Sequence, residues 1–225
     1  DLTGLHMASD TQFNKKSCTT GHTGFGVPHA SDPDNCDTPR SAGRVLRYMD
    51  RYVTVKQGDV MYTVGIITIS DKGAAGRRED KSGPKIRQML PKDEYEVVSY
   101  KIIPDERKQI ADELVRLSDD MKCNLVLTTG GTGFSPRDIT PEATMDVAQR
   151  NAPGIAEALR AYSMSLTPRA MLGRGVCVIR KNTLIVNLPG SVKAVSESMD
   201  FLMGNIEHGL DILLGYDSEC GGKLK

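Results

Sequence analysis

A glycine-rich run in the middle of the chain has the residue types that bind phosphate. Three of its residues have no side chain, so that backbone N–H groups could approach an anion closely there: Gly130, Gly131 and Gly133. Hydroxyl-bearing residues add donors at the same place: Thr128, Thr129, Thr132 and Ser135. The run matches neither common nucleotide fingerprint, because no Lys follows the glycines and their spacing is not G-x-G-x-x-G. It can therefore be a phosphate-binding loop or an ordinary turn between a strand and a helix.

The residues after the glycines favour a phosphate site. In the segment 136–142, Arg137 and Asp138 lie between two prolines, next to the candidate anion site. Further carboxylates follow other expected strands: Asp71, Asp80 and Asp105. Carboxylates repel a bound phosphate unless a cation lies between them, so the combination predicts Mg²⁺. Each carboxylate also has a structural explanation, such as Asp105 acting as the N-cap of the next helix.

The same loops lack the side chains of covalent catalysis. No Ser–His–Asp or Cys–His set can be placed in them, and we expect His208, the one histidine of the main domain, on the surface. Phosphoryl or nucleotidyl transfer needs no protein nucleophile when the attacking group is itself a phosphate. Positioning and charge neutralisation by a metal and by Lys or Arg are then sufficient.

Alternating apolar segments predict the elements that would position these loops. We expect buried strands at 64–69, 95–103 and 124–128, because these runs are short, apolar and rich in β-branched residues. Helices are expected at 84–90 and after Asp105, the latter with the apolar stripe Ile110, Leu114, Leu117 and Met121. Strands and helices that alternate in this way predict a parallel sheet covered on both faces.

The second half of the chain is expected to complete the sheet. Helices should begin at Pro141, with Thr140 as N-cap, and at Pro153, the second running to about residue 165. The runs 176–179 and 184–186 predict a β-hairpin that closes an edge of the sheet. One long helix should follow Ser191, with an apolar stripe from Val192 to Leu213. Ligands of such a sheet bind at the carboxyl ends of its strands, in the loops 70–83, 103–106, 128–138 and 187–191.

Composition excludes several classes of protein. The formal net charge is +0, 5% of the residues are aromatic and Trp is absent. This argues against a nucleic-acid-binding surface, which needs basic excess and stacking side chains. No apolar run reaches the length of a membrane span, and the five scattered cysteines suggest reduced thiols. We therefore expect a soluble cytoplasmic protein.

The chain divides into three parts by composition. Residues 1–59 are expected to form a flexible or loosely ordered arm, 60–216 the main domain, and 217–225 a frayed tail. Residues 5–9 could derive from a cloning vector. The arm contains Cys18, His22, His29 and Cys36, whose spacing fits no compact zinc module.

The motifs of the main domain resemble a known family. Thr128–Gly133 followed by Pro136–Thr144 is similar to the motif of the bacterial molybdopterin adenylyltransferases of the MogA and MoaB type and of the gephyrin G domain. Shorter motifs match in the same order: Ile69–Asp71, Asp80–Gly83, Ile103–Glu106 and Asn187–Gly190. The similarity covers about residues 62–214.

The resemblance implies a fold and a reaction. The fold is a three-layer αβα domain with a mostly parallel sheet, assembled as a homotrimer. The reaction transfers AMP from Mg-ATP to the phosphate of molybdopterin and releases pyrophosphate, within molybdenum cofactor biosynthesis. The product would pass to a molybdenum insertase. A non-catalytic pterin-binding or scaffolding member of the family is the alternative, and a sulfur- or metal-handling module that uses the arm is a further one.

The resemblance also implies roles for individual residues. Asp105 and Asp138 become the essential acidic pair, acting through Mg²⁺. The substrate-binding residues for the pterin and its phosphate would be Thr129, Gly130, Gly131, Thr132, Gly133, Ser135 and Arg137. The nucleotide-binding residues would be Ser70, Asp71, Asp80, Ser82, Gly83, Pro189, Gly190 and Ser191.

Overall fold

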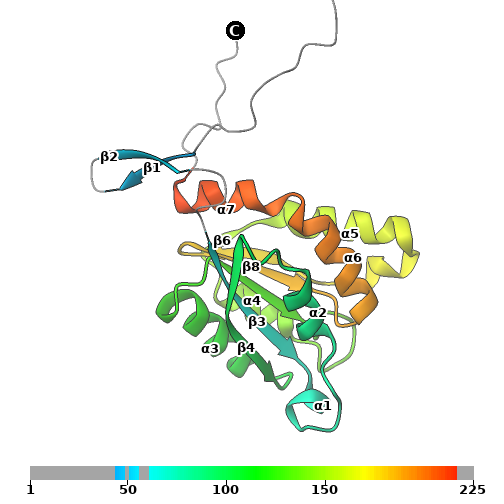
Figure 1. Ribbon diagram of the computed structural model, residues 1–225. Coiled ribbons are helices and arrows are strands. Elements are labelled where there is room, and N and C mark those ends of the chain that lie inside the picture. The colour runs from blue at the N-terminus through cyan, green and yellow to red at the C-terminus, as the bar shows by residue number, and fades with distance from the viewer. Residues whose placement is uncertain (1–43, 49–50, 56–60, 217–225) are drawn as a thin grey trace, which may run out of the picture. The chain divides into compact units, whose positions relative to one another are not determined.

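The computed structural model describes residues 44–48, 51–55 and 61–216 (Figure 1). Strands β1 (Arg44–Tyr48) and β2 (Arg51–Val55) pair antiparallel as a two-stranded sheet. The remainder of the predicted arm, including the candidate zinc ligands, and the predicted tail 217–225 lie outside the described residues.

A six-stranded sheet forms the centre of the domain, in the order β4-β3-β5-β8-β7-β6. β3 (Tyr62–Ile69) pairs in parallel with β4 (Tyr95–Ile103) and with β5 (Leu125–Thr129), which pairs in parallel with β8 (Thr183–Leu188). Parallel neighbours bring the carboxyl ends of β3, β5 and β8 to the same rim of the sheet. The predicted mostly parallel α/β sheet is confirmed.

Helices cover both faces of this sheet, as Figure 1 shows. On one face lie α2 (Ser82–Met89), α5 (Pro153–Leu166), α6 (Val192–Met203) and α7 (Ile206–Leu214). On the other lie α3 (Arg107–Val115) and α4 (Thr140–Asp146). Side chains of β3 alternate between the two cores, Ile66 packing into the first and Ile67 into the second. The three-layer arrangement follows from this alternation.

The predicted β-hairpin is present near one edge of the sheet. β7 (Cys177–Arg180) and β8 pair antiparallel, and β8 joins the hairpin to the parallel strands by pairing with β5. The short strand β6 (Arg150–Asn151) pairs with β7 and forms the edge. The sequence did not reveal β6, because this strand has only two residues and both are exposed.

Three predicted helix details were wrong. The expected long last helix divides into α6 and α7 at Gly204 and Asn205, where the Asn205 amide donates to the Phe201 carbonyl at 2.8 Å. Thr140 is not an N-cap, because its hydroxyl donates to the Gly130 carbonyl at 3.0 Å and α4 has no side-chain cap. Met121 leaves the apolar stripe of α3 because a π-helical turn, η1 (Arg116–Asp120), changes the register, and its side chain is exposed.

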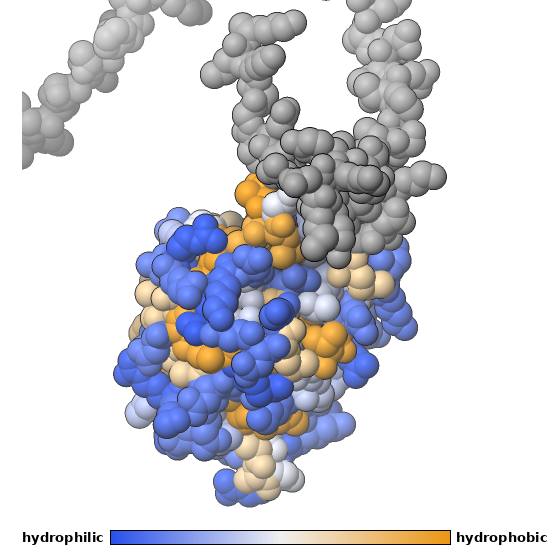
Figure 2. Space-filling model, turned by 90° about the vertical axis from the view of Figure 1, so that its left-hand side faces the viewer, coloured by the Kyte–Doolittle hydropathy of each residue, from blue (hydrophilic) through white to orange (hydrophobic). Residues whose placement is uncertain are grey.

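The surface mixes polar and apolar side chains. Figure 2 shows hydrophilic residues interspersed with small apolar groups on the face it presents, as is usual when the large apolar side chains fill a core. In the part of the chain that the structure describes, no helix combines the length and the apolar character needed to cross a membrane.

Candidate functional site

A cleft of about 1090 Å³ opens at the carboxyl ends of β3, β5 and β8. Most of the predicted site residues line it: Ser70, Asp80, Ser82, Asp105, Thr129, Gly130, Gly131, Thr132, Gly133, Asp138, Pro189, Gly190 and Ser191. The rim of a parallel sheet is the expected place for a ligand. The loops that were predicted to converge therefore do so.

Asp105 is held at the cleft by the loop after β3. Its Oδ2 accepts a hydrogen bond from the Asp71 backbone N–H at 2.9 Å, and its own N–H donates to Asp71 Oδ1 at 3.1 Å. The structural reading of Asp105 as an N-cap was wrong, because Glu106 occupies that position of α3. Burial, followed by the negative charges of Asp71 and Asp138, raises the pKa of the Asp105 carboxyl.

Asp138 is held by the glycine-rich loop itself. Its Oδ2 accepts from the backbone N–H groups of Gly133 at 2.9 Å and Ser135 at 3.2 Å. The Gly133 N–H, which the sequence suggested for a bound phosphate, already donates to a side chain of the protein. The loop presents a carboxylate to the cleft in addition to any anion that it binds.

The two carboxylates suit a divalent cation shared with a phosphate. Asp138 is close enough to Asp105 that its negative charge contributes to the raised pKa of the Asp105 carboxyl. Among the described residues, Oδ1 of each carboxylate has no hydrogen-bond donor, while Oδ2 is anchored. No group of three or more His, Cys, Asp or Glu that could hold a metal occurs in these residues. Two carboxylates with phosphate oxygens and water are the usual ligands of Mg²⁺ in nucleotide sites.

Two glycines are required by the packing of the loop. Gly130 has φ +98°, and a Cβ there would lie 2.2 Å from the Ile69 carbonyl oxygen. Gly131 has φ +63°, and a Cβ there would lie 2.3 Å from Thr140 Oγ1 and 2.9 Å from Asp105 Oδ1. Both positions allow the loop after β5 to pass closely beside the strand end of β3 and the carboxylate.

Asp80 has a structural role at the edge of the cleft. Its carboxylate accepts from Thr68 and Tyr100 hydroxyls, both at 2.5 Å, and from the Ser82 N–H at 2.9 Å at the start of α2. Burial would raise the pKa of Asp80, but these hydrogen bonds outweigh it and lower the pKa. Burial and the Asp80 carboxylate raise the pKa of Tyr100 to about 12. A Cβ on Gly83 would lie 2.4 Å from the Tyr100 ring, so glycine permits this contact.

The turn after β8 is tied to its neighbours through its carbonyl groups. Thr129 Oγ1 donates to the Pro189 carbonyl at 2.6 Å, and Ser82 Oγ donates to the Gly190 carbonyl at 3.0 Å. Ser191 caps α6 by accepting from the Ala194 N–H at 3.2 Å. The turn is thus fixed to β5 on one side and to α2 on the other.

Four predicted site residues do not line the cleft: Asp71, Gly83, Ser135 and Arg137. Asp71 lies in the short helix α1 (Asp71–Ala74), and the Arg137 side chain reaches it with two hydrogen bonds of 3.0 Å. Arg137 also donates to Glu106 at 2.7 Å. Its guanidinium therefore links its own loop to the segments that follow β3 and β4. The pKa of Asp71 is lowered mainly by the hydrogen bond from Arg137.

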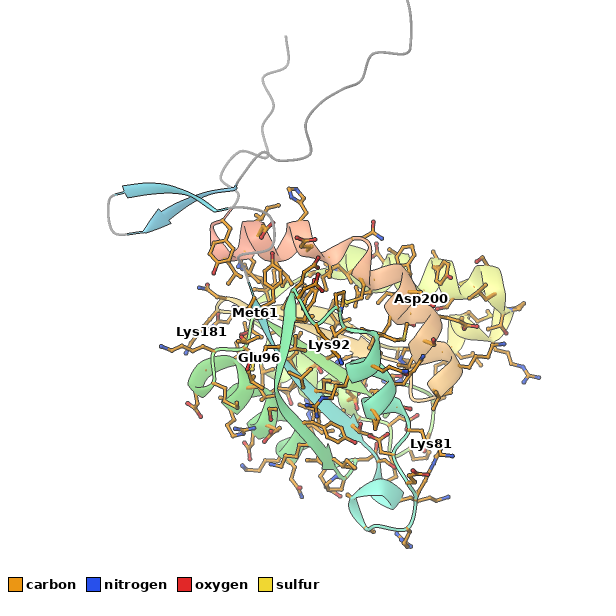
Figure 3. The ribbon with its side chains drawn as sticks, in the orientation of Figure 1. Met61, Lys81, Lys92, Glu96, Lys181 and Asp200 are labelled. Carbon is orange, nitrogen blue, oxygen red and sulfur yellow. The ribbon has the colours of Figure 1, made fainter. Side chains whose placement is uncertain are left out.

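Other cleft residues were not named individually from the sequence, although Arg78, Lys81 and Asn187 lie in loops that it had assigned to the site. A second wall comes from α5, the following turn η2 (Pro168–Leu172) and α6, with Arg160, Ser163, Arg169, Glu197 and Ser198. The polar loop before α2 adds Arg78 and Lys81, and the Lys81 side chain is labelled in Figure 3. Asn187 is buried, and its amide donates to Thr128 at 2.9 Å and Thr144 at 3.0 Å. A buried Asn within a strand was the one signal that could have identified such a polar junction.

Arg174 is a further residue that the sequence did not reveal. Its guanidinium donates to the Gly133 carbonyl at 2.7 Å and to the Asp138 carbonyl at 2.6 Å. It also pairs with Glu142. Burial would raise the pKa of Glu142, but the Arg174 hydrogen bond, a backbone hydrogen bond and the charges of Arg174 and Arg107 together lower it. It therefore contacts both ends of the loop that carries Asp138.

Comparison with known proteins agrees with this geometry. Residues 65–208 match the family described as a probable molybdopterin binding domain. The chain is 40% identical over 156 residues to a molybdopterin adenylyltransferase of Helicobacter pylori strain J99, an alignment covering 68% of this chain and 88% of the relative. It is 39% identical over 162 residues to gephyrin of Dictyostelium discoideum, covering 68% of this chain and 22% of gephyrin.

A solved structure supports the same assignment. The molybdopterin biosynthesis enzyme MoaB of Thermus thermophilus superposes with a TM-score of 0.66 at 43% identity, covering 69% of this chain and 98% of that one. The matched family region contains the glycine-rich loop, both cleft carboxylates and the turn after β8. The chain belongs to the molybdopterin-binding domain family of the MogA, MoaB and gephyrin type.

Proposed function

We propose that this protein is a molybdopterin adenylyltransferase of molybdenum cofactor biosynthesis. It would transfer AMP from Mg-ATP to the phosphate of molybdopterin and release pyrophosphate. The observation that carries the proposal is the convergence of Asp105 and Asp138 at one cleft, beside a glycine-rich loop. The similarity to the molybdopterin adenylyltransferase of Helicobacter pylori supports it.

The proposed roles follow the two sides of the cleft. The loop from Thr129 to Gly133, with Ser135 and Arg137, would bind the pterin and its phosphate. Ser70, Asp71, Asp80, Ser82, Gly83 and the turn 189–191 would bind or shape the nucleotide side. For Asp71, Asp80 and Arg137 the contacts favour support of the loops over direct contact with the ligand.

The chemistry requires only positioning and charge neutralisation. An oxygen of the molybdopterin phosphate attacks the α-phosphorus of ATP, a new P–O–P bond forms, and the bond to the β-phosphate breaks as pyrophosphate leaves. No His or Cys lines the cleft among the described residues, in agreement with a step that needs no protein nucleophile. Mg²⁺, when bound with the triphosphate, neutralises its negative charge. Asp105 and Asp138 would hold the Mg²⁺ near the reacting phosphate through their unanchored oxygens.

A turnover assay tests the proposal against a protein that only binds pterin. The full chain is mixed with molybdopterin, ATP and Mg²⁺, and pyrophosphate is measured with each component omitted in turn. We expect pyrophosphate only in the complete mixture, with AMP recovered on the pterin. Binding of molybdopterin without pyrophosphate release would contradict the proposal and favour a scaffolding role.

Assembly and cellular setting remain predictions from the resemblance. These are the homotrimer, the transfer of the product to a molybdenum insertase and the cytoplasmic location. A sedimentation measurement on the full chain tests the first of them, and a monomer at micromolar concentration would contradict it.

A further inference from the structure

Arg174 does not line the cleft, but it holds the loop that carries Asp138 through several hydrogen bonds. Its Nε donates to the Gly133 carbonyl and one terminal nitrogen to the Asp138 carbonyl, at 2.7 and 2.6 Å. The other terminal nitrogen binds Glu142, at the start of α4. The Arg174 backbone N–H donates to the Thr132 carbonyl at 2.9 Å. One residue thus contacts the loop before, within and after the segment 133–138.

The loop is also closed from inside by the carboxylate that it carries. Asp138 Oδ2 accepts hydrogen bonds from the N–H groups of Gly133 and Ser135. Arg174 donates hydrogen bonds to the carbonyl groups of Gly133 and Asp138. The donors and acceptors of the same short segment are therefore satisfied by two different side chains. Rotation of the Asp138 carboxylate would break its hydrogen bonds with the Gly133 and Ser135 N–H groups. Movement of the Asp138 backbone would break its hydrogen bond with Arg174.

Arg174 is itself held in place by a second arginine. Arg160 of α5 donates to the carbonyls of Gly173 and Gly175, each at 3.0 Å, on both sides of Arg174. A Cβ on Gly175 would lie 3.0 Å from the Asn187 carbonyl oxygen, so this segment packs tightly against the end of β8. The backbone from which the Arg174 side chain extends is therefore fixed.

Arginine suits this position better than lysine. The planar guanidinium can donate in three directions at once, whereas an ammonium on a flexible stem cannot hold two carbonyls and a carboxylate in one plane. We propose that Arg174 is a positioning residue, which holds the loop 133–138 so that Asp138 stays beside Asp105 at the cleft. The kinetic consequence rests on the proposed adenylyl transfer, but the structural consequence does not.

The first test measures the loop without any substrate. Amide hydrogen exchange is followed in the full-length chain for wild type, Arg174→Ala and Arg174→Lys. We expect the Gly133 and Ser135 amides to exchange about tenfold or more faster in Arg174→Ala, with a smaller increase in Arg174→Lys, because their acceptor is no longer held. Unchanged exchange in both variants would overturn the inference.

Arg180→Ala is the matched control. Arg180 also binds a carboxylate, Asp119, at 2.6 and 3.0 Å and a carbonyl, Val147, at 3.1 Å, but it does not line the cleft. A general loss of stability would affect both variants in the same way. Faster exchange of the loop in Arg180→Ala, equal to that in Arg174→Ala, would also overturn the inference.

The second test measures turnover. In Arg174→Ala we expect kcat for pyrophosphate release to fall by about 10- to 100-fold, while KM for ATP changes by less than about threefold. A misplaced carboxylate reduces the stabilisation of the transition state more than it reduces ground-state binding of ATP. Arg180→Ala should keep kcat within about twofold of wild type. A wild-type chain that releases no pyrophosphate would contradict the proposed function alone, since the exchange result still decides the role of Arg174.

Discussion

Asp71 and Asp105 hold each other through exchanged backbone hydrogen bonds. Each N–H donates to the carboxylate of the other residue, at 2.9 and 3.1 Å, although the two residues are 34 positions apart in the chain. Two negative side chains are thereby kept close together at the ends of adjacent strands. Charge repulsion of this kind is a cost to stability that is expected where a site has been built for a cation.

Replacing Asp105 should therefore stabilise the fold at neutral pH. The pKa of Asp105 is raised above its ordinary value of 3.8 in the folded chain, so the folded state binds the proton more tightly than the unfolded state does. The free energy of unfolding then falls as pH rises through the interval between the ordinary and the raised pKa. Denaturant unfolding should show Asp105→Asn to be more stable than wild type at pH 7, with the difference lost below pH 3.8.

An Asp105→Asn variant that is less stable than wild type at pH 7 would contradict this prediction. Asp112→Asn, on the exposed side of α3, is the control for removal of one negative charge. It should show no comparable gain.

Removing the Asp71 charge should lower the pKa of Asp105. The Asp71 carboxylate raises that pKa, whereas the Asp71 backbone N–H, which lowers it, remains in Asp71→Asn. NMR titration of the Asp105 carboxyl in the ligand-free chain measures the change. An unchanged or higher midpoint in Asp71→Asn would show that the two charges do not interact as the geometry requires.

The central part of the site could be predicted because it follows strand ends. Glycines, hydroxyls and carboxylates after short apolar runs must meet at one rim when the strands are parallel, which is why Asp105, Asp138 and Gly130 were found. Arg174 could not be found in this way. The partners of its side chain lie between 32 and 41 residues away along the chain, and nothing near Arg174 in the sequence indicates them.

The errors in the fold have a similar cause. Thr140 has the residue type of an N-cap, but a tertiary contact with Gly130 uses its hydroxyl. The apolar stripe of the last helices continues across Gly204, so the pattern gave no sign of the break. Local propensity was overruled in each case by a contact or a turn that periodicity does not describe.

Gly130 and Gly76 allow a test of the packing of the loop. Both have positive φ, +98° and +67°, but a Cβ on Gly76 would meet nothing within 4 Å. Gly76→Ala should cost about 1–2 kcal/mol of unfolding free energy through its backbone conformation alone. Gly130→Ala should cost about 1–3 kcal/mol more, because its Cβ would meet the rigid Ile69 carbonyl. Equal losses in denaturant unfolding would contradict the close approach.

Tyr100 reports on the Asp80 junction. The pKa of Tyr100 is raised to about 12, first by burial and then by its hydrogen bond to Asp80 and the charge of that carboxylate. In Asp80→Asn the charge is lost while burial remains, so the pKa should fall toward the ordinary value of 10.0. Ultraviolet titration of tyrosine, with Tyr100→Phe subtracted, measures it. No change in the Tyr100 midpoint would show that Asp80 is not its partner.

The most direct test of the central claim is pyrophosphate release by Asp105→Asn, Asp138→Asn and the double variant, with molybdopterin, ATP and Mg²⁺. Asn keeps an acceptor for the Asp71, Gly133 and Ser135 N–H groups, so the loops should stay folded. If the two carboxylates act on one bound ion, each single variant loses about 100-fold or more in rate, and the double variant is hardly slower than the worse single one. Near-wild-type release by either single variant, or losses that multiply in the double variant, would contradict the claim.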